Sequence, residues 1–269
     1  LNIKTKGDLH DNWNSDKAIE ARESMLDGSF RYCSTDKCPH LNNVVHNDRP
    51  SGPVTRRTDD LVKKLIDQEL PTSMKVVFDS ACNLACPSCR INFIRNEDYI
   101  TNKSRKILQD VEKYYGKSLE FISMSGYGDP FYSEALFEWL CNFSTSTYPN
   151  MANIHMHTNA MLWNENNWNK IKSAHPFIKS TEISIDASKP ETYHKVRKGG
   201  KWNLLLKNLK FINSLDQVND IILSFVIQDD NYEEIVPFYK LMNSIFDKER
   251  NLSFQYYKGM SKKVPIVLK

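Results

Sequence analysis

The sequence predicts an α/β fold built on a parallel sheet. From residue 74 to residue 257, strand-like and helix-like runs alternate along the chain, which indicates successive βαβ units. Polar motifs follow several of the strand-like runs directly, and in folds of this kind the chemistry lies at the carboxyl ends of the strands. The chain has 269 residues, of which 40% are hydrophobic, enough for one large core with a small appendage.

The elements are assigned from apolar periodicity, β-branched content and breakers. The predicted strands are Met74–Asp79, Leu119–Met124, Ile154–Thr158, Thr181–Asp186, Ile221–Gln228 and Leu252–Tyr257. The predicted helices between them are Ser104–Tyr115, Ser133–Phe143, Asn164–Ser173, Trp202–Leu215 and Tyr232–Phe246. This order gives six strands, each joined to the next by a crossover that contains a helix.

Residues 1–71 lack this alternation and are predicted to form a small, mainly helical extension. A helix is expected over Asp16–Leu26, capped by Asn14 or Ser15 and followed by Gly28. A second amphipathic helix is expected over Thr58–Leu70, where Pro71 ends it. We therefore expect three parts: residues 1–71, a barrel-like region over 72–260, and a tail over 261–269.

Three cysteines follow the first predicted strand at C-x3-C-x2-C spacing: Cys82, Cys86 and Cys89. A structural zinc site needs four protein ligands, and no fourth cysteine or histidine lies in this loop. Three thiolates with one position left open suit a 4Fe–4S cluster, whose fourth iron can bind something else. The alternatives are three buried structural thiols, or a zinc site completed from elsewhere in the chain.

Composition limits the remaining possibilities. A net charge of +3 gives no case for nucleic acid, and no apolar run approaches the length of a transmembrane helix. Clustered cysteines in a chain of this size favour metal ligation in a reducing cytosol, so we expect a cytoplasmic protein. The chain begins with Leu1 and shows no signal-peptide pattern, so we expect residues upstream to be missing.

Polar turns follow the second and third predicted strands. Gly126 and Gly128 would let the backbone approach a ligand closely, and Asp129 could accept hydrogen bonds from an amine. A turn of this composition is also ordinary loop chemistry when it stands alone. Thr158 and Asn159 follow the third strand, in which His155 and His157 should point the same way.

The fourth strand carries a further polar pair. Ser184 and Asp186 alternate with Ile183 and Ile185, so the polar side chains should point inward. Arg197 follows in a loop that ends in two glycines, where its guanidinium could bind a carboxylate with two hydrogen bonds. A solvated basic loop is the alternative for this segment.

These motifs together resemble the radical S-adenosylmethionine (SAM) family. The resemblance rests on the cysteine spacing, the Gly126–Pro130 turn, the Thr158-Asn159 pair and the Tyr193–Gly200 segment. It implies a partial (β/α)6 TIM-type barrel with a 4Fe–4S cluster on Cys82, Cys86 and Cys89. The residues that the resemblance places around SAM are Gly126, Gly128, Asp129, Thr158, Asn159, Ser184, Asp186 and Arg197.

The chain departs from the family pattern at four positions. Tyr127 is inserted between the glycines, and Asp129 stands where the family has glutamate. Ala160 replaces the usual glycine after the Thr-Asn pair. Ser88 precedes the third cysteine, where the family often has an aromatic residue. The individual SAM contacts are therefore less closely specified than the cysteine ligands.

The resemblance also implies a mechanism. An electron from the reduced cluster cleaves SAM to methionine and a 5′-deoxyadenosyl radical, which takes a hydrogen atom from the substrate. An electron donor such as flavodoxin or ferredoxin would be a partner. Peptide or protein modification is the expected function, with a dehydrogenase or epimerase of a sugar or other small molecule as the alternative. A non-catalytic Fe–S binding protein is the rival from another class.

The first segment has a resemblance of its own. Its Trp13–Ser15, Asp27–Phe30 and Cys33–Pro39 stretches resemble the closing part of a SPASM-type domain, which holds an auxiliary Fe–S cluster. Cys33 and Cys38 are the expected ligands of this possible second cluster. In the family this domain usually follows the barrel and has further cysteines, so the segment here is expected to be incomplete. The pattern is the reason for expecting a peptide substrate.

Overall fold

The computed structural model describes residues 9–34, 70–124, 127–247 and 251–258. The chain divides into two compact units, Leu1–Pro71 and Thr72–Lys269, which are described separately below. The larger unit contains the sheet, and the described residues of the smaller one include two helices.

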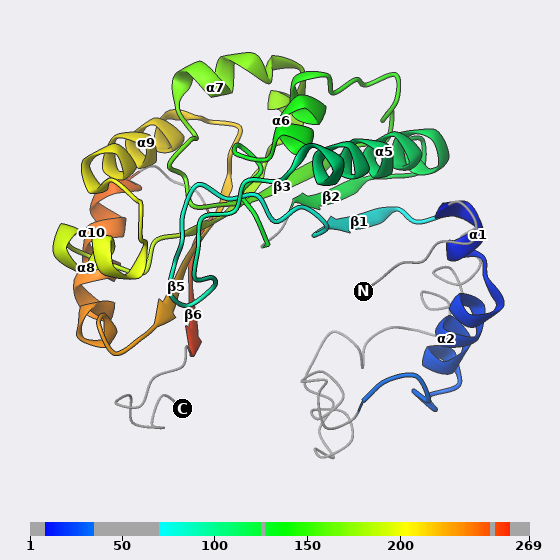
Figure 1. The fold of residues 1–269 in the computed structure, drawn as a ribbon, viewed down its shortest axis with the longest axis horizontal. Coiled ribbons are helices and arrows are strands. Elements are labelled where there is room, and N and C mark those ends of the chain that lie inside the picture. The colour runs from blue at the N-terminus through cyan, green and yellow to red at the C-terminus, as the bar shows by residue number, and fades with distance from the viewer. Residues whose placement is uncertain (1–8, 35–69, 125–126, 248–250, 259–269) are drawn as a thin grey trace. The chain divides into compact units, whose positions relative to one another are not determined.

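Six parallel strands form one sheet in the order β1-β2-β3-β4-β5-β6, so each strand pairs with its neighbours in the sequence (Figure 1). The strands are β1 Ser73–Val76, β2 Phe121–Met124, β3 Asn153–Thr158, β4 Ser180–Ser184, β5 Asp220–Ile227 and β6 Asn251–Lys258. In the described part of the chain, β1 and β6 form no ladder with each other. The sheet is therefore an open, partial barrel, which confirms the predicted α/β fold.

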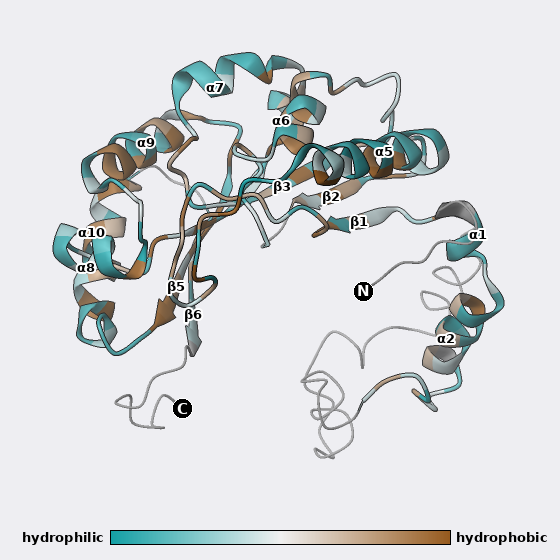
Figure 2. Cartoon of the chain, viewed as in Figure 1, coloured by the Kyte–Doolittle hydropathy of each residue, from teal (hydrophilic) through white to brown (hydrophobic). Residues whose placement is uncertain are grey.

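Helices connect the strands and lie along the outer face of the sheet in Figure 1. They are α5 Asp98–Tyr115, α6 Glu134–Cys141, α7 Glu165–Lys170, α8 Pro190–Val196, α9 Trp202–Ser214 and α10 Ile235–Ile245, with 3₁₀ turns at Lys172–Phe177 and Tyr232–Glu234. Figure 2 shows brown and teal residues on both α5 and α9, as expected for helices with one buried face. Leu205, Leu209 and Ile212 form the buried face of α9.

Burial explains the strand pattern. Strand β5 is apolar along most of its length and is mostly brown in Figure 2, and five of its eight residues are buried. Strand β3 alternates instead, with Ile154, Met156 and Thr158 buried and the two histidines between them half-buried. The same-side placement predicted for His155 and His157 is therefore confirmed.

The boundaries of several helices and strands differ from the predicted ones. Strand β1 ends at Val76 rather than Asp79, because the chain leaves the sheet there to enter the cysteine loop. Helix α5 begins at Asp98, six residues before its predicted start. Helix α8 was not predicted; it has only seven residues, and its signal is Pro190 at the first helical turn.

In the smaller unit, helix α2 spans Asp16–Leu26, as predicted, and α1 spans Leu9–Trp13. The Ser15 hydroxyl accepts a hydrogen bond from the Ala18 amide at 3.4 Å, which confirms one of the two predicted caps. Arg22 of α2 donates to the Trp13 carbonyl at 2.8 Å and lies over the Trp13 ring, so the two helices hold each other. Of the predicted helix Thr58–Leu70, all but Leu70 lies outside the described residues, as does the tail over 261–269.

Candidate functional site

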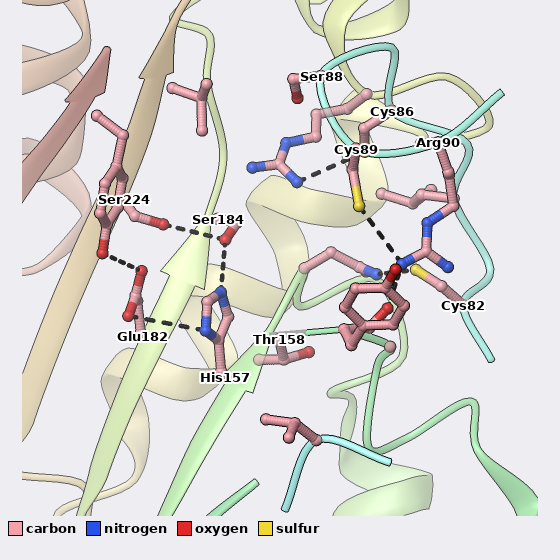
Figure 3. A pocket seen from close by; sticks show the side chains of 18 of the residues that line it. Cys82, Cys86, Ser88, Cys89, Arg90, His157, Thr158, Glu182, Ser184 and Ser224 are labelled. Atoms are coloured by element: carbon pink, nitrogen blue, oxygen red, sulfur yellow. Dashed lines mark hydrogen bonds and ion pairs between the residues drawn. The ribbon is translucent and has the colours of Figure 1, made fainter. Parts of the chain in front are cut away.

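A cavity of about 500 Å³ lies at the carboxyl ends of the strands. Loop residues line one part of it and strand side chains line the other (Figure 3). All three cysteines of the first loop face this cavity, together with predicted site residues from four further segments: Gly128, Thr158, Asn159, Ser184 and Arg197. Motifs that follow different strands in the sequence therefore meet at one cavity.

The cysteine loop is held by backbone hydrogen bonds. The Cys82 amide donates to the Ile94 carbonyl at 2.9 Å, and the Cys89 amide donates to the Cys86 carbonyl at 2.9 Å. The Ala85 amide donates to the Lys198 carbonyl, which ties this loop to the segment after α8. Cys82 and Cys86 are buried, whereas Cys89 is exposed.

Each cysteine sulfur lies within reach of one side-chain N–H donor. Asn159 Nδ2 donates to Cys82 Sγ at 3.7 Å. Arg197 Nη1 donates to Cys86 Sγ at 3.5 Å, and Arg90 Nη2 donates to Cys89 Sγ at 3.5 Å. Two positive charges and one amide thus surround three sulfurs, an environment that stabilises thiolates and sulfur-bound iron. Sequence reasoning did not single out Arg90, although its place beside Cys89 was a signal.

The three sulfurs lie around one cavity rather than around one point. Among the described residues, no three His, Cys, Asp or Glu side chains come close enough together to hold one metal ion. In a 4Fe–4S cluster each of the three thiolates would bind a different iron. Burial raises the pKa of the Cys82 thiol to about 11, and the positive charge of Arg90 acts in the opposite direction.

The loop after β2 packs directly on the cysteine loop. A Cβ added at Gly128 would stand 2.6 Å from the Ala81 carbonyl oxygen, so only glycine fits there without backbone movement. The Asp129 amide donates to the same carbonyl at 2.8 Å. The close backbone approach predicted at this turn is thus made to the neighbouring loop. Gly126 lies outside the described residues.

Asp129 occupies a different place from the one its predicted role implies. It is 1% exposed and does not line the cavity. Its Oδ2 accepts from the Thr158 hydroxyl at 2.8 Å and the Asn159 amide at 2.9 Å, and its Oδ1 accepts from the Phe131 amide. Burial raises the pKa of this carboxyl, and the hydrogen bonds act in the opposite direction. In this geometry Asp129 positions Thr158 and Asn159, which do face the cavity.

Asp186 and Arg197 form a buried ion pair, with Arg197 Nη2 2.8 Å from Asp186 Oδ2. Asp186 is fully buried, does not line the cavity, and accepts from the Val226 amide at 2.7 Å. Arg197 faces the cavity, and its Nε is buried without a hydrogen-bond partner. Burial raises the pKa of Asp186, opposed by the neighbouring guanidinium. The pair joins the end of β4 to the cysteine loop through Cys86.

Four strand side chains that the sequence reasoning passed over also line the cavity. They are Lys75 of β1, Glu182 of β4, Ser224 of β5 and Tyr257 of β6, beside His157 and Ser184. Glu182 had a signal in the sequence, because it has the same parity along β4 as Ser184 and Asp186. Tyr257 had none, since the pairing of β6 with β5 decides its place.

The two cysteines of the first segment are described only in part. Cys33 is half-buried in the smaller unit, and its amide donates to the Phe30 carbonyl at 2.8 Å. Cys38 lies outside the described residues, so the auxiliary cluster stays a prediction. In the part of the chain that the structure covers, no helix has both the length and the apolar character needed to cross a membrane.

Comparisons with known proteins agree with this reading of the barrel. Residues 76–242, more than half of the chain, match the model of the radical SAM superfamily. Thirty chains in solved structures have similar chain traces, two of which are described here, and no curated protein matches the sequence. A crystal structure of archaeal TYW1 is 15% identical, with a TM-score of 0.35; the match covers 59% of this chain and 58% of that one.

The second structure is that of BtrN in complex with AdoMet and 2-DOIA. It is 14% identical with a TM-score of 0.30, and the match covers 67% of this chain and 83% of BtrN. These two likenesses are too weak to carry an argument about substrate. The family match covers the cysteine loop, strands β2 to β5 and the segment through Arg197, and on this ground the chain belongs to the radical SAM superfamily.

Proposed function

We propose that this protein holds a 4Fe–4S cluster on Cys82, Cys86 and Cys89, cleaves SAM reductively beside it, and abstracts a hydrogen atom from a substrate in the same cavity. Superfamily membership supports SAM-derived radical chemistry. The observation that carries the proposal is the convergence of the three cysteines on one cavity, with an N–H donor at each sulfur.

The residues around this cavity have separable tasks. When bound, the reduced cluster supplies the electron that cleaves SAM to methionine and a 5′-deoxyadenosyl radical. Thr158, Asn159 and Ser184 present polar side chains to the cavity and are proposed to orient SAM. Asp129 and Asp186 are proposed to act as positioning residues, because their carboxylates hold neighbouring groups rather than face the cavity.

Arg197 is proposed to position the cysteine loop and to meet the SAM carboxylate. Its guanidinium is shared between Asp186 and Cys86, which leaves the buried Nε without a partner. A guanidinium offers five N–H donors, so a carboxylate in the cavity can be bound while the ion pair persists. The remaining N–H donors would therefore let Arg197 hold the cysteine loop and bind the SAM carboxylate at the same time.

For the substrate, the SPASM-like pattern between Trp13 and Pro39 supports a peptide or protein, with Cys33 and Cys38 serving an auxiliary cluster. A small polar molecule such as a sugar derivative is the second candidate, favoured by the polar strand side chains in the cavity. A reduced flavodoxin or ferredoxin is the proposed electron donor, and the cytoplasm the proposed compartment. Neither a nucleic acid nor a membrane is a proposed partner.

Anaerobic reconstitution followed by assay of 5′-deoxyadenosine tests the proposal. With SAM and a strong reductant, the wild-type protein should contain iron and sulfide and release 5′-deoxyadenosine. Cys86→Ala should lose cluster and product together. Cys141→Ala is the matched control and should retain both, because Cys141 lies on α6 and does not line the cavity. Zinc without sulfide, or a loaded cluster that yields no 5′-deoxyadenosine, would show the proposal to be wrong.

A further inference from the structure

The strand side chains of the cavity form one connected polar network (Figure 3). The Tyr257 hydroxyl donates to Glu182 Oε1 at 3.2 Å, and His157 Nδ1 lies 3.7 Å from Glu182 Oε2. His157 Nε2 lies 3.1 Å from the Ser184 hydroxyl, which lies 3.0 Å from the Ser224 hydroxyl. Four strands contribute to this network, so it spans the part of the cavity that the loops do not line.

The protonation state of His157 follows from its surroundings. Burial lowers the pKa of His157, although the carboxylate of Glu182 acts against this shift. The ring is therefore neutral near pH 7 and carries one proton. That proton belongs on Nδ1, which faces the carboxylate, and Nε2 then accepts from Ser184. His157 thus places a neutral ring 3.7 Å from the Glu182 carboxylate and adds no positive charge there.

Glu182 consequently lacks a permanent cation. It is 9% exposed, and within the described residues no lysine or arginine forms an ion pair with it. Arg197 is held by Asp186 at 2.8 Å. Lys75 lines the cavity, but it lies on β1, is exposed, and makes no ion pair with the carboxylate. A carboxylate removed from water in this way is poorly compensated unless a cation joins it.

Tyr257 adds a neutral donor on the other side of the carboxylate. Burial, followed by the nearby Glu182, raises the pKa of this phenol to about 12, so the hydroxyl stays protonated. The carboxylate therefore accepts a hydrogen bond from one hydroxyl and has the His157 ring 3.7 Å away, with the open cavity beside it. This is a site with negative charge, directional hydroxyls and room for a ligand group.

We propose that Glu182 binds a protonated primary amine of the substrate, while the Ser224 and Tyr257 hydroxyls contact substrate hydroxyl or carbonyl groups next to it. The substrate class is thus an amine-bearing polar molecule, whether an amino sugar or a lysyl side chain. The inference rests on the proposed function, because it takes the part of the cavity away from the cysteines as the place where the substrate lies. The ammonium supplies the missing counter-charge of Glu182.

The test measures binding of two matched probe pairs to the cluster-loaded protein with SAM present. One pair is D-glucosamine and D-glucose; the other is a capped tripeptide with a central lysine and the same peptide with acetyl-lysine. Isothermal titration gives the affinity of each for the wild type and for Glu182→Gln. Glu191→Gln is the matched control, since Glu191 is exposed on α8 and does not line the cavity.

In at least one pair, the wild type should bind the amine at least tenfold more tightly than its neutral partner. Glu182→Gln should abolish this preference and Glu191→Gln should keep it. Tyr257→Phe, which leaves the carboxylate in place, should keep the preference at lower affinity. Thermal melting verifies that each variant is folded, so a loss confined to Glu182→Gln cannot be a folding failure.

Three results would overturn the inference. They are no amine preference in either pair, a preference that survives Glu182→Gln, and a loss of SAM affinity as large as the loss of amine affinity. The last would assign the carboxylate to the amino group of SAM itself. Release of 5′-deoxyadenosine is measured on the same wild-type preparation, so failure of the SAM chemistry is seen separately from failure of the amine site.

Discussion

Ala160 adopts a backbone conformation that is unfavourable for alanine. It lies after Thr158 and Asn159 with φ +60°, in the left-handed region that favours glycine. The family pattern has glycine at this point. Asn208 of α9 donates to the Ala160 carbonyl at 2.8 Å and to the Met161 carbonyl at 3.0 Å, so packing imposes the conformation. The local strain is compensated by hydrogen bonds from a distant helix.

Replacing this residue should relieve the strain. We expect Ala160→Gly to raise the free energy of unfolding by about 1 kcal/mol, because an L side chain in the left-handed region costs about that much. Chemical denaturation under anaerobic conditions measures the change. Ala135→Gly, in helix α6, is the contrasting control and should destabilise by about 1 kcal/mol. Equal losses from both substitutions would contradict the argument.

Arg90 is a second residue whose individual contacts support a prediction. Its guanidinium donates to the Ser80 carbonyl at 2.7 Å, to the Tyr127 carbonyl, and to Cys89 Sγ at 3.5 Å. It therefore links the cysteine loop to the loop after β2 and places a positive charge beside the one exposed cysteine of the three. A donor of this kind stabilises the reduced, more negative form of an iron–sulfur cluster.

Removing this charge should make the cluster harder to reduce. We expect Arg90→Gln to lower the cluster reduction potential by on the order of 60 mV, which corresponds to a tenfold change in a one-electron equilibrium. Arg95→Gln is the matched control, because Arg95 is exposed and pairs with Glu134. An electron paramagnetic resonance titration measures both potentials. Indistinguishable potentials in the two variants would remove the proposed role of Arg90.

At the scale of elements, strand β3 carries two histidines toward the concave side of the sheet. His155 Nδ1 bonds to the Ser180 hydroxyl at 2.8 Å, and His157 bonds to Ser184. Burial lowers the pKa of both, so the folded protein holds them neutral at pH values where the unfolded chain begins to protonate them. The stability contributed by this strand is therefore sensitive to acid.

The sign of this effect can be stated. Because the folded-state pKa values lie below the ordinary 6.5, the unfolded state binds more protons as the pH falls through that value. We expect the free energy of unfolding to fall below about pH 6.5, with a limiting slope of about 1.4 kcal/mol per pH unit for each histidine. Denaturant titrations between pH 8 and pH 5 measure the slope.

A double variant tests whether the histidines of β3 cause the pH dependence of the free energy of unfolding. His155→Gln with His157→Gln should flatten the curve, whatever its stability at pH 8. His194→Gln is the matched control, because His194 is exposed on α8, and its curve should run parallel to that of the wild type. A double variant with an undiminished slope would mean that other groups cause the acid sensitivity.

The end of helix α8 and the segment after it also contact the cysteine loop. Gly199, at φ +91°, lies against Phe93, and the Ala85 amide binds the Lys198 carbonyl. These contacts place the end of α8 on the cysteine loop. They explain why Arg197, which is 111 residues from Cys86 in the sequence, lies within hydrogen-bond distance of its sulfur. The segment after α8 therefore belongs structurally to the cluster site.

At the scale of the whole molecule, the cavity and the sheet both belong to the larger of the two units. Among the described residues, those that line the cavity fall between Lys75 and Tyr257, and the larger unit begins at Thr72. The six strands of the sheet lie in this unit as well. The larger unit thus contains the described cavity lining and the strands that hold it.

We expect a fragment that begins at Thr72 to assemble the first cluster without the smaller unit. It should bind iron and sulfide and form 5′-deoxyadenosine from SAM, because it contains all the described residues that line the cavity. The same fragment with Cys86→Ala should do neither. A higher iron content in the full chain, abolished by Cys33→Ser, would support an auxiliary cluster in the smaller unit. A folded fragment that binds no iron would contradict this division.

The sequence by itself determined the features that depend only on residues close together in the chain. The alternation of strands and helices, the Asp16–Leu26 helix with its Ser15 cap, and the grouping of Cys82, Cys86 and Cys89 could all be predicted from spacing and periodicity. These features are local because helix and strand periods, caps and ligand spacing are read over a few residues. The shift of β1 and α5 boundaries shows the limit of such reading.

Only the tertiary structure decided which side chains meet. It turned Asp129 and Asp186 away from the cavity, and it brought Tyr257 to Glu182 across 75 residues of sequence. It also brought Asn159 to Cys82 and Arg197 to Cys86 as donors to their sulfurs. The physical reason is that such contacts depend on strand register and on loop packing, which join residues remote in the chain and leave no pattern in the local sequence.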